Sequence, residues 1–195
     1  NGQGYLINTP EYGFTGIAKI TGGYNETTLV PDYYVVSLHE NRKEMNIFSY
    51  NNVLTPNSLE LINSFSIKDI YSLTNSLPDM EELDWDDDIL VQTVYDASLN
   101  VMQLFIGIKL ENRIDIFLYE PYATGSVKIS YVDSFYSPSK IDLALLKGTY
   151  SRNLNTVELS ITTVSDTVVS SYSFVPLIPS LGFSPTTRTT FDVDY

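Results

Sequence analysis

The sequence contains no cysteine and only one histidine, His39. The absence of cysteine excludes disulfides, thiol nucleophiles and thiolate metal sites. A single histidine excludes a metal site built on two histidines of one chain, and it leaves only one candidate base for a Ser–His–Asp arrangement. The sequence also contains no nucleophile-elbow pattern and no glycine-rich phosphate loop. We therefore predict no catalytic residues and a protein that is not an enzyme.

Basic residues are scarce, because 11 Lys and Arg stand against 24 Asp and Glu, for a formal net charge of −13. A nucleic-acid partner requires clustered cations that replace the counterions of the phosphates, and an anionic membrane surface attracts the same residues. No apolar run approaches the roughly 20 residues that cross a bilayer. We predict no nucleic-acid partner and no membrane insertion.

Charged residues make up only 18% of the chain, whereas aromatic residues reach 13% and include 15 tyrosines. Aromatic residues favour strands over helices. This cysteine-free composition is typical of extracellular, cell-surface or virion proteins, and we favour these locations over the cytoplasm. Because the sequence begins with Asn1, we expect either a removed leader or a longer parent chain.

Strand patterns dominate the chain, and Arg113–Phe135 shows them most clearly. From Ile114 to Tyr119 the side chains alternate between two faces, which predicts a half-buried strand. Similar runs cover residues 33–39, 45–50, 59–67 and 89–97. The pair Gly22–Gly23 predicts a tight turn between strands. Apolar residues at helical spacing are missing, so we expect no helix beyond a turn or two near Ile67–Leu77.

The strand pattern recurs along the chain. Met45–Tyr50 aligns with Ile114–Tyr119 at a fixed offset, and Ile62–Phe65 aligns with Val132–Phe135 after one inserted residue. A fainter third copy aligns Leu104–Gly107 with Leu145–Gly148, Ile114–Leu118 with Val157–Ile161, and Val132–Phe135 with Val169–Tyr172. The second and third copies lie about 40 residues apart, the usual length of a four-stranded propeller blade.

The repeated unit, YYVVSLHENRKEMNIFSYNN…SLELINSFSI, resembles a degenerate β-propeller blade of the WD40 or YVTN kind over about residues 33–174. The WD dipeptide and the GH pair of such blades are missing. The resemblance implies an all-β fold of antiparallel meanders in propeller-like four-stranded units. We expect a partial or irregular β-propeller, because three copies are fewer than a closed ring needs. The alternative is a two-sheet β-sandwich.

The sequence divides into three expected segments. Residues 1–32 form a Gly- and Tyr-rich β segment, and residues 33–174 form the repeated meander domain with an acidic insertion at 72–88. Residues 175–195 form a Pro-rich linker and a terminal strand.

The acidic insertion contains the run PDMEELDWDDD. Asp84, Asp86 and Asp88 stand at alternate positions, as in the opening of a calcium loop. The match then ends, because Ile89 stands in place of the loop glycine and Tyr95 in place of the closing glutamate. The alternatives are a solvated surface loop and a surface for a basic partner. Calcium is therefore the one cofactor that the sequence suggests.

Two places suggest an interface. Trp85 lies within the acidic run, where an aromatic side chain can anchor a partner. In the last segment, Phe191, Val193 and Tyr195 share one face of a strand that can dock on a neighbouring molecule. We expect protein partners, copies of this chain among them.

These observations predict a non-enzymatic interaction or structural scaffold within a larger assembly. One alternative is a structural subunit of an extracellular assembly, such as a virion, an appendage or a surface layer. A second alternative is a calcium- or carbohydrate-binding extracellular protein. In that case the tyrosines would form a sugar-stacking platform, whereas cross-strand aromatic pairing also explains them.

Overall fold

A computed structural model describes residues 18–39, 43–51, 58–72, 89–121, 128–165, 168–175 and 187–192. Within these ranges the chain forms twelve strands and one short helix, α1 (Ile67–Tyr71). The all-β fold is therefore confirmed, as is the short helix near Ile67. No helix in the described ranges has the length and apolar character needed to cross a membrane.

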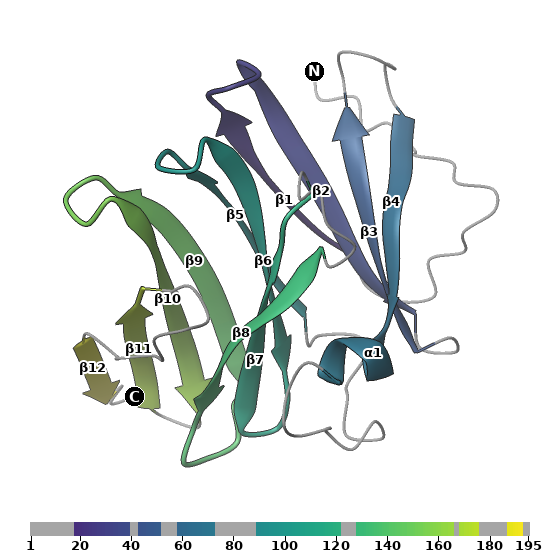
Figure 1. Ribbon diagram of the computed structural model, residues 1–195. Coiled ribbons are helices and arrows are strands. Elements are labelled where there is room, and N and C mark those ends of the chain that lie inside the picture. Colours follow the sequence, from purple (N-terminus) through teal and green to yellow (C-terminus); the bar gives the residue numbers. More distant parts are fainter. Residues whose placement is uncertain are drawn as a thin grey trace, which may run out of the picture.

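Three four-stranded sheets follow one another along the chain (Figure 1). The first contains β1 (Ala18–Asn25), β2 (Val30–His39), β3 (Glu44–Asn51) and β4 (Ser58–Ser66). The second contains β5 (Ile89–Asp96), β6 (Val101–Lys109), β7 (Arg113–Tyr119) and β8 (Ile129–Tyr136). The third contains β9 (Leu143–Ser151), β10 (Thr156–Ser165), β11 (Val168–Phe174) and β12 (Thr187–Asp192). Each sheet is an antiparallel meander, because its strands pair in chain order.

The first strands of the sheets bring the sheets together, because β1 contacts β5 and β5 contacts β9. One hydrophobic core lies between the first and second sheets and includes Val36, Ile47 and Leu104. A separate core lies between the second and third sheets and includes Phe105 and Leu159. The sheets thus form an arc of three propeller-like blades joined at their inner strands, and not the two-sheet sandwich.

The first two copies of the sequence repeat occupy equivalent strands. Met45–Tyr50 lies in β3 and Ile114–Tyr119 lies in β7, each the third strand of its sheet. The pairing register shifts between Ile47 and Phe48 in one sheet and at the aligned pair, Ile116 and Phe117, in the other. The bulge leaves Ile62 unpaired in β4 and Val132 unpaired in β8, and these two residues align with each other, so the inserted residue lies between the third and fourth strands rather than in the bulge.

The predicted third copy was aligned one strand out of place. Val157–Ile161, aligned with the third strand β7, lies in β10, the second strand of its sheet. The first strands of the second and third sheets begin at Ile89 and Leu143, which are farther apart than the expected period of about 40 residues. The error arose because alternating strands of similar composition align equally well at several positions.

The prediction of a turn at Gly22–Gly23 was wrong, because both residues lie inside β1. The chain turns at residues 26–29 instead. Gly22 pairs with Tyr33 of β2, and a Cβ atom at Gly22 would lie 2.3 Å from Cδ1 of the Tyr33 ring. Glycine here leaves room for an aromatic ring rather than for a turn.

The half-buried strand predicted for Ile114–Tyr119 is buried on both faces. Ile114 and Ile116 on one face and Asp115, Phe117 and Tyr119 on the other are all at most 1% exposed. The reason is the position of β7 in the middle sheet, which has a neighbouring sheet or the helix α1 against each face.

The described parts of the two terminal segments belong to the sheets. Residues 18–25 of the N-terminal segment pair with β2, and β12 of the C-terminal segment pairs with β11. The division of the chain into segments ending at residues 32 and 174 stays a prediction.

Gly148 fixes how closely the second and third sheets approach. A Cβ atom on Gly148 would lie 2.5 Å from Cγ2 of Val94 and 2.8 Å from Cδ2 of Leu159. We expect Gly148→Ala to lower the free energy of unfolding by about 1–3 kcal/mol, because the added methyl group forces these side chains apart. Urea unfolding of Gly148→Ala, Val94→Ala and the double variant measures the coupling. The second substitution should restore part of the loss, whereas additive effects would contradict this contact.

Candidate functional site

Each sheet begins with the same hairpin. Its first strand ends in Tyr24-Asn25, Tyr95-Asp96 or Tyr150-Ser151, and four turn residues follow. The last turn residue has a positive φ in all three hairpins, at Leu29, Asn100 and Asn155. The three tyrosines therefore mark equivalent positions in the three sheets.

A side-chain oxygen stabilises the first two of these turns. Asn25 Oδ1 accepts hydrogen bonds from the backbone N–H groups of Thr27 and Thr28, at 3.0 and 3.2 Å. Asp96 Oδ1 accepts the corresponding bonds from Ser98 and Leu99, at 2.9 and 3.2 Å. These are Asx turns, and they satisfy backbone donors that the strand ladder leaves unpaired.

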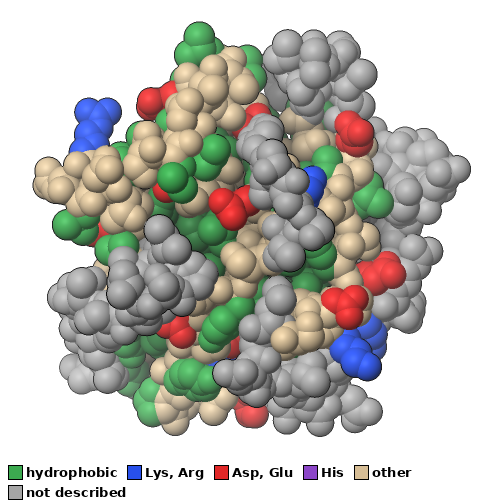
Figure 2. Space-filling model, viewed as in Figure 1, with side chains coloured by type: hydrophobic (Ala, Val, Ile, Leu, Met, Phe, Trp, Pro, Cys, Tyr) green, Lys and Arg blue, Asp and Glu red, His purple; other side chains and the backbone are tan. Residues whose placement is uncertain are grey.

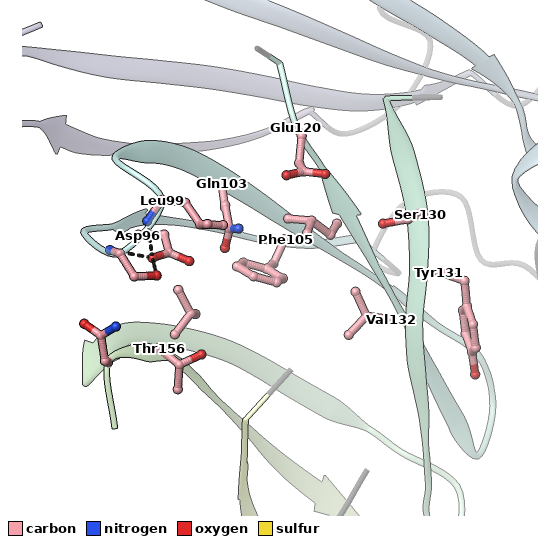
Figure 3. Close-up of a pocket in the computed structure, with 13 residues that line it drawn as sticks. Asp96, Leu99, Gln103, Phe105, Glu120, Ser130, Tyr131, Val132 and Thr156 are labelled. Carbon is pink, nitrogen blue, oxygen red and sulfur yellow. Dashed lines mark hydrogen bonds between the residues drawn. The ribbon is translucent and has the colours of Figure 1, made fainter. Parts of the chain in front are cut away.

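A pocket of about 470 Å³ opens between the second and third sheets, beside the turns that contain Leu99 and Asn155. The labelled side chains of Gln103, Phe105 and Glu120 extend into the space between the sheets (Figure 3). Asn155 and Thr156 close it from the third sheet. In the space-filling view, hydrophobic side chains appear in a hollow of this region with carboxylates beside them (Figure 2).

The pocket combines two carboxylates with amide and hydroxyl groups around an aromatic side chain, Phe105. Oδ1 of Asp96 is engaged by its own turn, where the Ser98 hydroxyl also donates to it at 2.6 Å. Glu120 is the second carboxylate of the lining. Within the described ranges, no three His, Cys, Asp or Glu side chains lie together as metal ligands. The described residues of the lining come from the second and third sheets, and the side chain of His39 is not described.

A buried ion pair lies on the opposite face of the middle sheet. Nε of Arg113 lies 3.0 Å from Oδ1 of Asp115, and the two side chains are 14% and 1% exposed. The hydroxyl of Ser134 donates to the same carboxylate and lies 2.8 Å from the hydroxyl of Tyr131. Burial, followed by the charge of Asp115, raises the pKa of Tyr71 far above its usual value. The network joins β7, β8 and α1, and we interpret it as structural.

Tyr119 gives a pH dependence of stability. Its hydroxyl donates to Asn63 Oδ1 at 2.5 Å, and burial raises its pKa from 10.0 to about 12. The folded protein keeps this proton at a higher pH than the unfolded chain does, so the stability that it contributes is complete below pH 10 and is lost between about pH 10 and 12.

We expect the free energy of unfolding to fall more steeply across this pH window in the wild-type protein than in Tyr119→Phe. Denaturant unfolding at stepped pH measures both slopes, with Tyr24→Phe at an exposed position as the control. Equal slopes for the wild-type protein and Tyr119→Phe would contradict the effect of burial on Tyr119.

The two ends of the arc expose apolar side chains. On the outer face of the first sheet, Ile20 and Tyr33 are 69% and 38% exposed, whereas Val35, the partner of Ile20 on β2, and Phe48 on β3 are buried. We name the exposed inner part the first end face, formed by Ala18, Ile20, Gly22, Tyr24 and Tyr33.

On the outer face of the third sheet, Leu143 and Leu145 are 67% and 49% exposed. We name this surface the last end face, formed by Leu143, Leu145, Lys147, Thr149, Glu158 and Ser160. A shallow hollow of about 360 Å³ lies in it and is lined by Lys147, Thr149 and Glu158 among others.

Most residues predicted from the sequence as site residues lie outside the described ranges. These are Asp84, Trp85, Asp86, Asp88, Val193 and Tyr195. Phe191 lies in β12, where it pairs with Val169, and its side chain is not described. The calcium site and the terminal interface stay predictions.

The tyrosines that the structure describes do not share one platform. Tyr33 and Tyr50 form a cross-strand pair, edge to face with ring centroids 6.3 Å apart. Tyr34 and Tyr119 are buried in the core between the first two sheets. The geometry thus favours aromatic pairing and packing over a sugar-stacking surface among the described tyrosines.

Sequence reasoning missed the pocket, the Arg113–Asp115 pair and the end faces. The motif of Tyr followed by Asn, Asp or Ser before a four-residue turn could have located the first strands that carry the end faces. It aligns all three sheets in the correct register, because turn residues are more distinctive than the strands they join.

No protein family model matches the sequence, and no curated protein sequence matches it. Among solved structures, the chain is similar to the β-propeller domain of Nup133 from Vanderwaltozyma polyspora, with 9% sequence identity and a TM-score of 0.39. The similar region covers 84% of this chain and 44% of that chain, so this chain spans less than half of that structure. The propeller-like arrangement described above rests on the strand pairing and the sheet contacts of this chain.

Proposed function

We propose that the protein is a non-enzymatic scaffold whose two end faces bind protein partners in a larger assembly. The observation that carries this proposal is the exposure of Ile20 and Leu145 on inner strands. The equivalent inner-strand faces between neighbouring sheets are covered inside the chain. Exposed apolar faces of this kind mark interaction surfaces in soluble proteins.

The pocket between the second and third sheets supports catalysis less well. One of its two carboxylates stabilises a turn, and its other polar groups are amides and hydroxyls. Acid–base chemistry that uses two carboxyl groups requires environments that separate their pKa values. A structural subunit of an extracellular assembly would use the same end faces. An extracellular location is suggested by the amino-acid composition alone.

Site-specific photo-crosslinking tests the scaffold function. The photoreactive residue p-benzoylphenylalanine replaces Ile20 or Leu145, with Leu99 as the control because it is equally apolar and 59% exposed on a turn of the middle sheet. In an extract of the cells that make the protein, we expect adducts from the two end-face positions. Excess wild-type chain should compete for them, whereas a chain carrying glutamate at the same position should not. Equal adducts from Leu99, or none from either end face, would contradict the proposal.

A further inference from the structure

The inner strands meet through a repeated pairing of positions. Gly23 of the first sheet faces the second sheet, where Cε of Met102 and Oγ1 of Thr93 lie 3.2 and 3.4 Å from the place of a Cβ on Gly23. Val94 of the second sheet faces Gly148 of the third. We call Tyr24, Tyr95 and Tyr150 the marker tyrosines of the three sheets. Both contacts follow one rule. The residue directly before the marker tyrosine of one sheet faces the residue two positions before the marker tyrosine of the next sheet.

Each of these contacts matches a glycine with a β-branched residue. At Gly148 the missing Cβ leaves space that Val94 fills, and at Gly23 it leaves space that Thr93 and Met102 share, so the two inner strands approach closely. Hydrogen bonds strengthen the first contact, because the backbone N–H of Thr93 donates to Thr21 Oγ1 at 3.1 Å. At the turns, the hydroxyls of Thr27 and Tyr95 lie 2.9 Å apart.

The same rule, continued past the third sheet, pairs Thr149 with Gly22. Thr149 directly precedes Tyr150 on the last end face, and Gly22 stands two positions before Tyr24 on the first end face. This is again a β-branched residue against a glycine. The ring of Tyr33, which lies over Gly22, would then face the hollow that Thr149 lines.

We infer that two copies of this chain associate head to tail, with the last end face of each copy packed on the first end face of the other. This inference rests on the proposed function, because it names the partner of the end faces. The contact is heterologous, and such contacts either close into rings or continue into filaments. The described sheets of two copies number six, within the 4–8 blades of typical propellers, whereas those of three copies would exceed that range.

Sedimentation equilibrium of the full chain tests this inference. We expect twice the chain mass of 22.0 kDa for the wild-type protein. Ile20→Glu and Leu145→Glu each place a charge in both contacts of the ring, so each should weaken the dimer at least tenfold and yield the single-chain mass. Leu99→Glu on the middle sheet should leave the dimer intact. Circular dichroism and thermal unfolding confirm that the variants fold, as their exposed positions allow.

Three results would overturn the inference. They are a single-chain mass for the wild-type protein at the highest soluble concentration, a dimer that resists both end-face substitutions, and a dimer that Leu99→Glu disrupts equally. A wild-type monomer that still gives specific adducts with another protein from the end-face positions would overturn only the choice of partner. A monomer without such adducts would overturn the scaffold function as well.

Discussion

Replacing Asp115 by alanine is expected to lower the free energy of unfolding by about 3–5 kcal/mol. The carboxylate is 1% exposed and binds Arg113 Nε at 3.0 Å. Its loss leaves a largely buried guanidinium without its counter-charge and removes the acceptor of the Ser134 hydroxyl. A buried charge or hydrogen-bond donor without a partner has given up its hydration and gains no interaction in return, which destabilises the folded state. Urea unfolding, monitored by far-UV circular dichroism, gives the free energy of unfolding.

The matched control is Glu111→Gln, with Asp115→Asn as the milder change at the site. Glu111 is exposed in the turn before β7, so its neutralisation should change the free energy of unfolding by less than about 0.5 kcal/mol. Asp115→Asn keeps the shape and one acceptor, and it should fall between the control and alanine. If Asp115→Ala matches Glu111→Gln, the ion pair does not stabilise the link between β7, β8 and α1.

Phe117→Ala is expected to destabilise the protein by a similar amount, about 3–5 kcal/mol. The ring is fully buried and lies edge to face with Tyr71 and Tyr131, at centroid distances of 5.7 and 5.9 Å. Alanine loses the buried aromatic surface, leaves a cavity and removes both ring contacts. The measurement is again urea unfolding at neutral pH.

Leu118→Ala is the control for Phe117, because it is the next residue along β7 and is only partly buried on the opposite face. It should cost clearly less than Phe117→Ala. If both substitutions lower the free energy of unfolding equally, packing against the first sheet does not stabilise β7 more than packing on the face toward the third sheet.

The strands themselves could be predicted from the sequence, since alternation and aromatic content are local properties. The equivalence of β3 and β7 was also predictable, because their residues align at a fixed offset. The structure agrees, since both sheets have a bulge at the aligned positions. The third sheet was misaligned because its strands match several registers equally. Its turn, with Tyr150 and the positive φ of Asn155, carries the more specific signal.

The candidate surfaces were harder to predict because they depend on which sheet faces which. Asp115 looks like a solvent-facing residue in an alternating strand, and only the stacking of α1 and the first sheet on that face buries it. Ile20 and Leu145 look like ordinary strand residues, and their exposure follows from their positions at the two ends of the arc. Sequence alternation reports the two faces of a strand and not the neighbours of each face.

The most direct test of the head-to-tail arrangement is to mix Ile20→Glu with Leu145→Glu. Each variant alone lacks one end of every contact, so each should sediment with the single-chain mass of 22.0 kDa. In the mixture, the intact last end face of Ile20→Glu meets the intact first end face of Leu145→Glu, so one unmodified contact becomes possible. We predict a heterodimer in the mixture, weaker than the wild-type dimer because it has one contact instead of two. A mixture that contains only single chains, or a variant that dimerises by itself, would contradict the pairing of the two end faces.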